Sequence, residues 1–263
     1  MDFSFKDFIS AEDFDADKLL ESQVQADNDR KGDLPFYDCP ICKNKGQVYF
    51  INGNGNEAVK KCECMSIRES YRRIAESGLH RELKSKSFDN YVCKFPFQIE
   101  CKAKAEKFLS DNASSFFYIG GQSGSGKTHL CTAISGKLLE SGYALKYLKW
   151  ASESPKILSL SGNDDRIKKE AILNEINNVA VLYIDDFLRS KSPSQAEIRL
   201  AFEIIDYRYT NELKTIISSE KPLSNLFEVD EAIAGRIYER TKKSEYSITI
   251  KYSTDYNFRA NSI

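Results

Sequence analysis

The most specific chemical pattern in the chain is a glycine-rich stretch that fits the phosphate-binding pattern G-x-x-x-x-G-K-[ST]. Glycines let such a loop point its N–H groups inward, where they and the next helix N-terminus can cradle a polyphosphate. Lys127 is expected to reach the β- and γ-phosphates, and the Thr128 hydroxyl to ligate Mg²⁺. A glycine-rich turn before an ordinary helix is the alternative. The apolar run before the loop and the helical pattern after it favour nucleotide binding. The predicted cofactor-binding stretch is Gly121, Gln122, Ser123, Gly124, Ser125, Gly126, Lys127, Thr128 and His129.

Two consecutive carboxylates follow a second apolar run, residues 179–184. A strand that ends in acidic residues downstream of a phosphate loop is typical of the Walker B motif. Asp185 is predicted to hold Mg²⁺, directly or through water. Asp186 is predicted to orient or polarise the attacking water. A strand that ends in an ordinary polar turn is the alternative.

Four cysteines form two close pairs, Cys39 with Cys42 and Cys62 with Cys64. Residues 47–51 and 57–61 between the pairs are candidate strands of a hairpin, with a turn at 52–55. Two cysteine pairs at the ends of a hairpin predict a Cys₄ zinc site, because thiolates suit tetrahedral Zn²⁺. A reduced cluster without metal, or a redox pair, is the alternative. No further group suggests an open catalytic position, so we expect the metal to stabilise the fold.

The phosphate loop must sit in an α/β domain, because apolar strand patterns alternate with helical ones from residue 116 onward. Candidate strands cover 116–119, 145–148, 180–184, 215–218 and 246–250, which predicts a five-stranded parallel sheet with its ligands at the carboxyl ends of the strands. Ser192, as N-cap before Pro193, predicts the start of one helix. Phe88 and Tyr91, ahead of the sheet, either flank an adenine base or pack in the core.

Composition limits the remaining classes of function. The 263 residues carry 38 Lys and Arg against 39 Asp and Glu, a net charge of −1, so the protein is not coated in basic charge. No apolar run approaches the 18 or so residues that span a membrane, and the N-terminus has no signal-peptide layout. We therefore expect a cytoplasmic protein with no membrane partner, in which seven cysteines serve metal or core roles.

The chain is predicted to divide into four parts. Residues 1–33 form an acidic segment, either a partly ordered tail or a partner-binding helix. Residues 34–68 form the Cys₄ module, and residues 69–90 a basic helical linker. Residues 91–263 form the ATPase domain. Basic residues from Arg68 to Lys86 either touch nucleic acid or coat a solvated helix.

Several motifs in the second half resemble the DnaC/DnaI-type helicase loaders of bacteria and phages, a group that includes the IstB transposition helpers. They are Ile-Asp-Asp at 184–186, Thr-Ile-Ile-Ser-Ser-Glu at 215–220, Gly-Arg-Ile-Tyr-Glu-Arg at 235–240 and Asn-Phe-Arg at 257–259. The resemblance covers about residues 87–263. It implies an AAA+ P-loop NTPase of the initiator clade without a separate C-terminal lid. It also implies a sensor at Ser219 or Glu220, an arginine finger at Arg240, an interface arginine at Arg236 and a sensor-2-like Arg259. Two surface arginines are the alternative for Arg236 and Arg240.

By the same resemblance, the protein loads a hexameric DnaB-type replicative helicase onto single-stranded DNA, with ATP hydrolysis as a switch. It assembles with further copies of itself through the ATP site. An extra helix within residues 152–177 is expected to face single-stranded DNA with Lys156, Arg166, Lys168 and Lys169. Asp186 is one methylene shorter than the Glu common at this position, which predicts slow hydrolysis. A transposition helper and a non-hydrolysing nucleotide-dependent adaptor are the alternatives.

Overall fold

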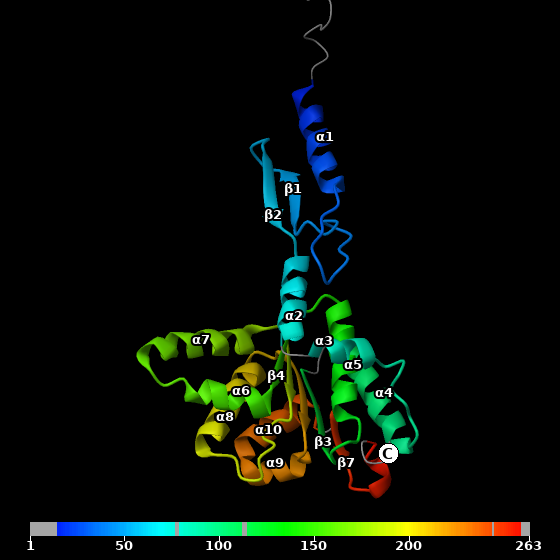
Figure 1. Ribbon diagram of the computed structural model, residues 1–263, viewed down its shortest axis with the longest axis vertical. Helices are drawn as coiled ribbons and strands as arrows, with labels where there is room; N and C mark the ends of the chain where they lie inside the picture. The colour runs from blue at the N-terminus through cyan, green and yellow to red at the C-terminus, as the bar shows by residue number, and fades with distance from the viewer. Residues whose placement is uncertain (1–14, 77–78, 112–114, 244, 259–263) are drawn as a thin grey trace, which may run out of the picture. The chain divides into compact units, whose positions relative to one another are not determined.

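A computed structural model describes residues 15–76, 79–111, 115–243 and 245–258. The described residues form two compact units, which divide between Arg68 and Glu69 (Figure 1). Residues 1–14 of the predicted acidic segment lie outside the described residues. Among the described helices, none combines the length and the apolar character that crossing a bilayer requires.

The first unit contains helix α1 (Ala16–Asp29) and an antiparallel hairpin of β1 (Gln47–Ile51) and β2 (Glu57–Lys61), followed by the start of α2 (Cys64–Glu76). Both strands have the predicted bounds. In the turn, the side-chain oxygen of Asn52 accepts hydrogen bonds from the backbone N–H groups of Asn54 (2.9 Å) and Asn56 (3.1 Å). The side-chain amide of Asn28 in α1 exchanges two hydrogen bonds with the backbone of Tyr49, which fastens α1 to β1.

The second unit is built on one parallel sheet, as predicted. Its strands are β3 (Phe116–Gly121), β4 (Leu145–Lys149), β5 (Val181–Asp185), β6 (Lys214–Ser219) and β7 (Ser247–Ile250). Their order across the sheet is β4-β5-β6-β3-β7. All neighbouring pairs are parallel, so the carboxyl ends of β3, β5 and β6 meet at one edge. The phosphate loop, Asp185 and Glu220 follow these three ends.

Alternate residues of β3 enter opposite cores, as the two-residue period of a strand requires. Phe117 and Ile119 pack toward α4 (Pro96–Ser110) and α5 (Lys127–Glu140). Phe116 and Tyr118 pack on the other face. That face is covered by α6 (Trp150–Ser159), α7 (Asn163–Asn178), α8 (Gln195–Thr210), α9 (Leu223–Val229) and α10 (Glu231–Arg240). Figure 1 shows these two groups of helices on either side of the strands. A 3₁₀ turn, η2 (Thr254–Tyr256), follows β7.

Two local expectations are wrong. The N-cap of α8 is Ser194, whose side chain accepts a hydrogen bond from the backbone N–H of Glu197, so Ser192 and Pro193 lie before the helix. Arg68 does not face solvent: it is 5% exposed, and its guanidinium donates to the backbone carbonyl of Leu34 (2.6 Å) and the side chain of Asn44 (2.7 Å).

The residues predicted as a basic linker pack on the parallel sheet of the second unit. Ile74 and Leu79, the latter in helix α3 (Leu79–Ser85), are buried in the same core as α4 and α5. The hydroxyl of Ser70 accepts a hydrogen bond from the backbone N–H of Leu145 at the start of β4 (3.0 Å). These residues therefore belong to the core of the second unit and do not form a separate solvated linker.

Candidate nucleotide-binding site

The backbone of the phosphate loop takes conformations that only glycine adopts easily. Gly121 has φ +116°, and a Cβ there would lie 2.1 Å from the carbonyl oxygen of Ile250. Gly126, the N-cap of α5, has φ +92° in the left-handed region. The loop is thus shaped between β3 and α5 as the sequence pattern predicts, with the helix N-terminus open to a ligand.

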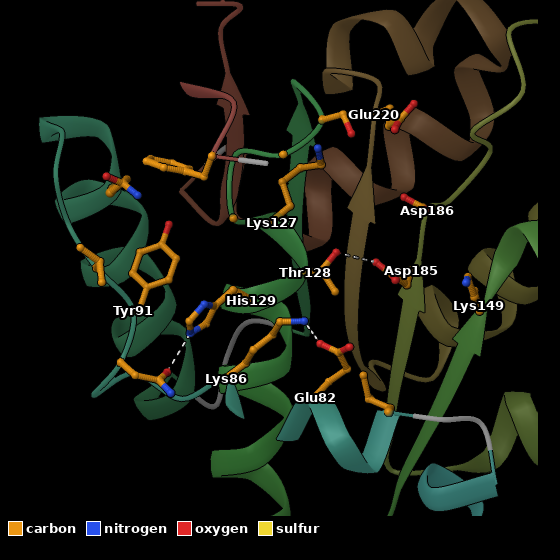
Figure 2. A pocket seen from close by; sticks show the side chains of 18 of the residues that line it. Glu82, Lys86, Tyr91, Lys127, Thr128, His129, Lys149, Asp185, Asp186 and Glu220 are labelled. Atoms are coloured by element: carbon orange, nitrogen blue, oxygen red, sulfur yellow. Dashed lines mark hydrogen bonds and ion pairs between the residues drawn. The ribbon is translucent and has the colours of Figure 1, made fainter. Parts of the chain in front are cut away.

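Lys127 and Thr128 stand at the start of α5. The Nζ of Lys127 donates to the backbone carbonyls of Gly121 (2.8 Å) and Gln122 (2.7 Å), so its ammonium group lies over its own loop. The Oγ1 of Thr128 lies 3.4 Å from Oδ1 of Asp185 (Figure 2). A hydroxyl and a carboxylate this close are hard oxygen ligands of the kind that Mg²⁺ prefers, and they fit the predicted metal.

These residues line a cavity of about 850 Å³ at the carboxyl edge of the sheet. Figure 2 shows Tyr91 and His129 on one side of Thr128, and Asp185 and Asp186 on the other. The predicted residues that line the cavity are Tyr91, Ser123, Gly124, Gly126, Lys127, Thr128, His129, Asp185, Asp186 and Glu220. The lining also includes the apolar side chains of Leu79 and Val92 and the charged side chains of Glu82 and Lys86. The cavity therefore has an aromatic side at Tyr91 and His129 and an acidic side at Asp185 and Asp186.

The carboxylate of Asp185 is held by donors that the sequence patterns did not indicate. It accepts hydrogen bonds from the hydroxyl groups of Tyr147 (3.0 Å), Tyr183 (3.0 Å) and Ser218 (2.5 Å). Burial, more than the charge of Asp185, raises the pKa of Tyr147 and of Tyr183, so both stay protonated and donate. The carboxylate is thereby fixed in a direction that faces Thr128.

Asp186 differs from its neighbour in backbone and in charge environment. Its φ is +57°, which lies in the left-handed region. Burial, followed by the charge of Asp185, raises the pKa of Asp186 above its usual value. The guanidinium of Arg189 lies 3.4 Å from the Asp186 carboxylate and 3.4 Å from that of Glu220. Arg189 also lines the cavity and belongs to none of the predicted motifs.

Tyr91 and His129 form the aromatic side of the cavity. Their rings meet edge to face, with centroids 5.2 Å apart. The Nε2 of His129 lies within hydrogen-bond distance of Oδ1 of Asn90 (3.0 Å) and the carbonyl of Ser87 (3.1 Å). Burial lowers the pKa of His129, which favours the neutral imidazole. A neutral ring beside a phenol suits contact with a planar base.

A comparison with models of known protein families identifies the family of this chain. The model of IstB-like ATP binding proteins matches residues 66–256, which include the whole sheet and all the cavity-lining residues except Phe258. The chain belongs to this family.

Relatives and solved structures agree with the assignment. Phage-like element PBSX protein XkdC of Bacillus subtilis is 29% identical over 239 residues, which cover 86% of this chain and 87% of that protein. The replicative helicase loader DnaC of Escherichia coli is 25% identical over 181 residues, covering 68% of this chain and 70% of DnaC. The crystal structure of DnaI matches with a TM-score of 0.53 at 24% identity over 66% of this chain and 94% of that one. The predicted resemblance and the AAA+ fold of the DnaC and DnaI type are confirmed.

Within this family member, four predicted residues other than the α10 arginines point away from the cavity. Phe88 is 6% exposed and packs in the core beside α4 and α5. Gln122 exchanges two hydrogen bonds with the backbone of Ser253. The Ser125 hydroxyl donates to the carbonyl of Gln122 (2.7 Å). The Ser219 hydroxyl donates to the carbonyl of Phe187 (2.9 Å), so Glu220, not Ser219, faces the cavity.

The two arginines of α10 also lie outside the cavity of their own chain. The Nε of Arg236 lies 2.6 Å from the carboxylate of Asp206, and Nη1 of Arg240 lies 2.9 Å from that of Glu212. Both guanidinium groups lie over the ring of Tyr209, at 5.6 and 4.5 Å from its centroid. Arg259 lies outside the described residues.

The four cysteines of the first unit come together as a buried cluster. The sulfurs of Cys39 and Cys62 lie 3.8 Å apart, and those of Cys42 and Cys64 lie 3.5 Å apart. All four sulfurs lie within 4.8 Å of one another. Tetrahedral Zn²⁺ with Zn–S bonds of about 2.3 Å separates its sulfurs by about 3.8 Å, so this arrangement fits zinc.

Proposed function

We propose that this chain is an ATP-driven helicase loader that places a hexameric DnaB-type replicative helicase on single-stranded DNA. The observation that carries the ATP part is the approach of Thr128 to Asp185 beside Lys127 in one cavity. In this proposal Lys127 binds the phosphates, Thr128 and Asp185 hold Mg²⁺, and Asp186 orients the attacking water. Magnesium would supply charge neutralisation of the phosphates.

The geometry also supports a second copy as a partner. Arg236 and Arg240 lie on α10 outside their own cavity, so in this proposal the nucleotide that they contact belongs to another copy. In this proposal Arg240 acts as the arginine finger across the interface, and hydrolysis releases the interface. Glu220 takes the predicted sensor position, because it lines the cavity and Ser219 does not.

In this proposal the first unit binds the helicase. Helix α1 has no buried residue, and Leu19 on it is 56% exposed, as expected of a helix that meets a partner. Zinc held by the four cysteines would keep the adjoining hairpin folded. The helices α6 and α7 occupy the predicted insertion before β5, where Lys156, Arg166, Lys168 and Lys169 are proposed to meet single-stranded DNA.

A transposition helper is the second candidate, and the match to IstB-like proteins over residues 66–256 favours it. The two functions share the ATP site and differ in the protein partner. Co-purification of the full chain with the replicative hexamer of its host, with and without ATP, tests the first. Retention of a transposase, and no retention of the helicase, would replace it with the second.

Multiple-turnover hydrolysis of ATP excludes the third candidate, a non-hydrolysing adaptor. We expect Lys127→Ala and Arg240→Ala each to abolish it, and a mixture of the two variants to regain part of the activity. Such rescue occurs only if Arg240 of one copy serves the intact phosphate loop of another. No rescue at any mixing ratio would count against the finger in trans.

A further inference from the structure

Arg189 is a cavity-lining cation to which none of the predicted motifs gives a role. It stands in the loop after β5 and contacts both acidic groups at the ends of β5 and β6, Asp186 and Glu220, at 3.4 Å each. It therefore bridges two chain segments that are 34 positions apart, 186 and 220. Both segments border the cavity on the side of Asp185 and Asp186.

The backbone that precedes Arg189 is fixed against β6. The N–H of Phe187 donates to the carbonyl of Ser218 (2.9 Å), and the carbonyl of Phe187 accepts from the hydroxyl of Ser219 (2.9 Å). Phe187 and Leu188 are both fully buried, and Leu188 has φ +46°. The loop thus carries Arg189 to the cavity on a rigid base, and only its side chain is free to rearrange.

The ion pairs that Arg189 makes are easy to exchange. Its side chain is 53% exposed, and 3.4 Å is long for a hydrogen bond. Exposed pairs of this kind contribute little to stability. Arg189 also borders a second cavity of about 560 Å³ beside Trp150, which leaves the guanidinium room to move.

A terminal phosphate is a better partner for this guanidinium than either carboxylate. It carries more charge, and its oxygens match the planar fork of an arginine. The same end of the cavity holds three carboxylates, Asp185, Asp186 and Glu220, which would repel a triphosphate unless cations offset them. Lys127, Lys149 and Arg189 are lining cations near these carboxylates, and Arg189 is the one that contacts both Asp186 and Glu220.

We propose that Arg189 distinguishes nucleoside triphosphate from diphosphate within its own chain, by leaving the Asp186–Glu220 bridge for the γ-phosphate. This inference rests on the proposed nucleotide binding and adds a contact in cis to the arginine offered by a second copy. Glu220 competes with the phosphate for the guanidinium. The position of Arg189 thus depends on whether a γ-phosphate is bound, and its contacts with Asp186 and Glu220 at the ends of β5 and β6 change accordingly.

The test is equilibrium binding of ADP and of a non-hydrolysable ATP analogue to the full chain with Mg²⁺. We expect Arg189→Gln to weaken triphosphate binding about 10-fold, as loss of a charge-assisted contact does, and to change ADP binding less than about twofold. Arg189→Lys keeps the charge and is expected to fall between wild type and Arg189→Gln. Arg199→Gln, an exposed arginine of α8 outside the cavity, is the matched control and is expected to bind both nucleotides as wild type does.

A double-mutant cycle tests the competition with Glu220. Glu220→Gln is expected to tighten triphosphate binding in the wild-type background more than in the Arg189→Gln background. Equal losses of ADP and triphosphate binding in Arg189→Gln, no loss of either, or an equal gain from Glu220→Gln in both backgrounds would overturn the inference. A wild-type chain that binds neither nucleotide would refute the proposed function itself, and this inference with it.

Discussion

Removal of zinc should unfold the first unit and leave the second intact. Among the described residues of the first unit, the four cysteines form the buried cluster, against which the partly buried side chains of Tyr37 and Val48 pack. Such a core is too small to keep the unit folded without a bound metal or a covalent cross-link. Structural zinc contributes on the order of 10 kcal/mol in comparable sites, so its loss exceeds the stability of a unit of this size.

The unfolding of the first unit can be measured as the number of cysteine thiols that react fast. Of the seven cysteines, Cys93 is exposed, and the other six are buried. Cys101 and Cys131 belong to the core of the second unit and stay protected when the first unit unfolds. We therefore expect one fast-reacting thiol in the zinc-bound chain, and five after chelation, namely Cys93 and the four ligands.

The assay is reaction of the full chain with a chromogenic disulfide, before and after a strong chelator, beside measurement of bound metal. Cys93→Ser is the matched control and should lower each count by one. Nucleotide binding by the second unit should survive chelation, because that unit has its own core. A purified chain that is folded and free of metal, or one fast thiol after complete chelation, would refute the reasoning.

Three further predictions concern the second unit. Lys127→Ala should weaken binding of the ATP analogue at least about 10-fold in a calorimetric titration, because a charged contact to the phosphates is lost; unchanged affinity would contradict the site. Arg240→Ala should leave the nucleotide affinity of the isolated chain within about twofold, because Arg240 lies outside the cavity of its own chain. ATP turnover should nevertheless fall about 1,000-fold. A loss of nucleotide affinity as large as the loss of turnover would mean that Arg240 acts on the nucleotide of its own chain. Arg208→Met should lower the free energy of unfolding by about 3 kcal/mol in thermal melts, because a fully buried guanidinium donates to Thr215 and to four backbone carbonyls; Arg199→Met, exposed on the same helix, is the control.

The sequence predicted those features whose signals are local. The hairpin of the first unit is fixed by two five-residue runs around an Asn-Gly turn, and both strands were predicted at their observed bounds. The sheet strands were predicted to within two residues, because each is a short apolar run that ends at Gly or at polar residues. The pairing of Cys39 and Cys42 with Cys62 and Cys64 follows from the hairpin, which brings its two ends together.

Features that depend on strand order were not predictable in this way. Tyr147 and Tyr183 both reach Asp185 because β4 lies beside β5 in a register that sets the two tyrosines opposite each other. The sequence contains no sign of which strand is the neighbour of β5. The burial of Phe88 and the burial of Arg68 have the same origin, since each depends on packing against residues distant in the chain.

The alternation of side chains along a strand explains why Glu220, and not Ser219, faces the cavity, a choice that the sequence motif leaves open. Ser218, Ser219 and Glu220 are consecutive, so only alternate side chains can face the same side at the end of β6. Ser218 donates to Asp185, while Ser219 turns the other way and donates to the carbonyl of Phe187. Glu220 then returns to the cavity side and meets Arg189. A ligand that moves Arg189 would therefore act on β6 through Glu220 and on β5 through Asp186. The buried Phe187, fastened to both strand ends, would keep those two responses together.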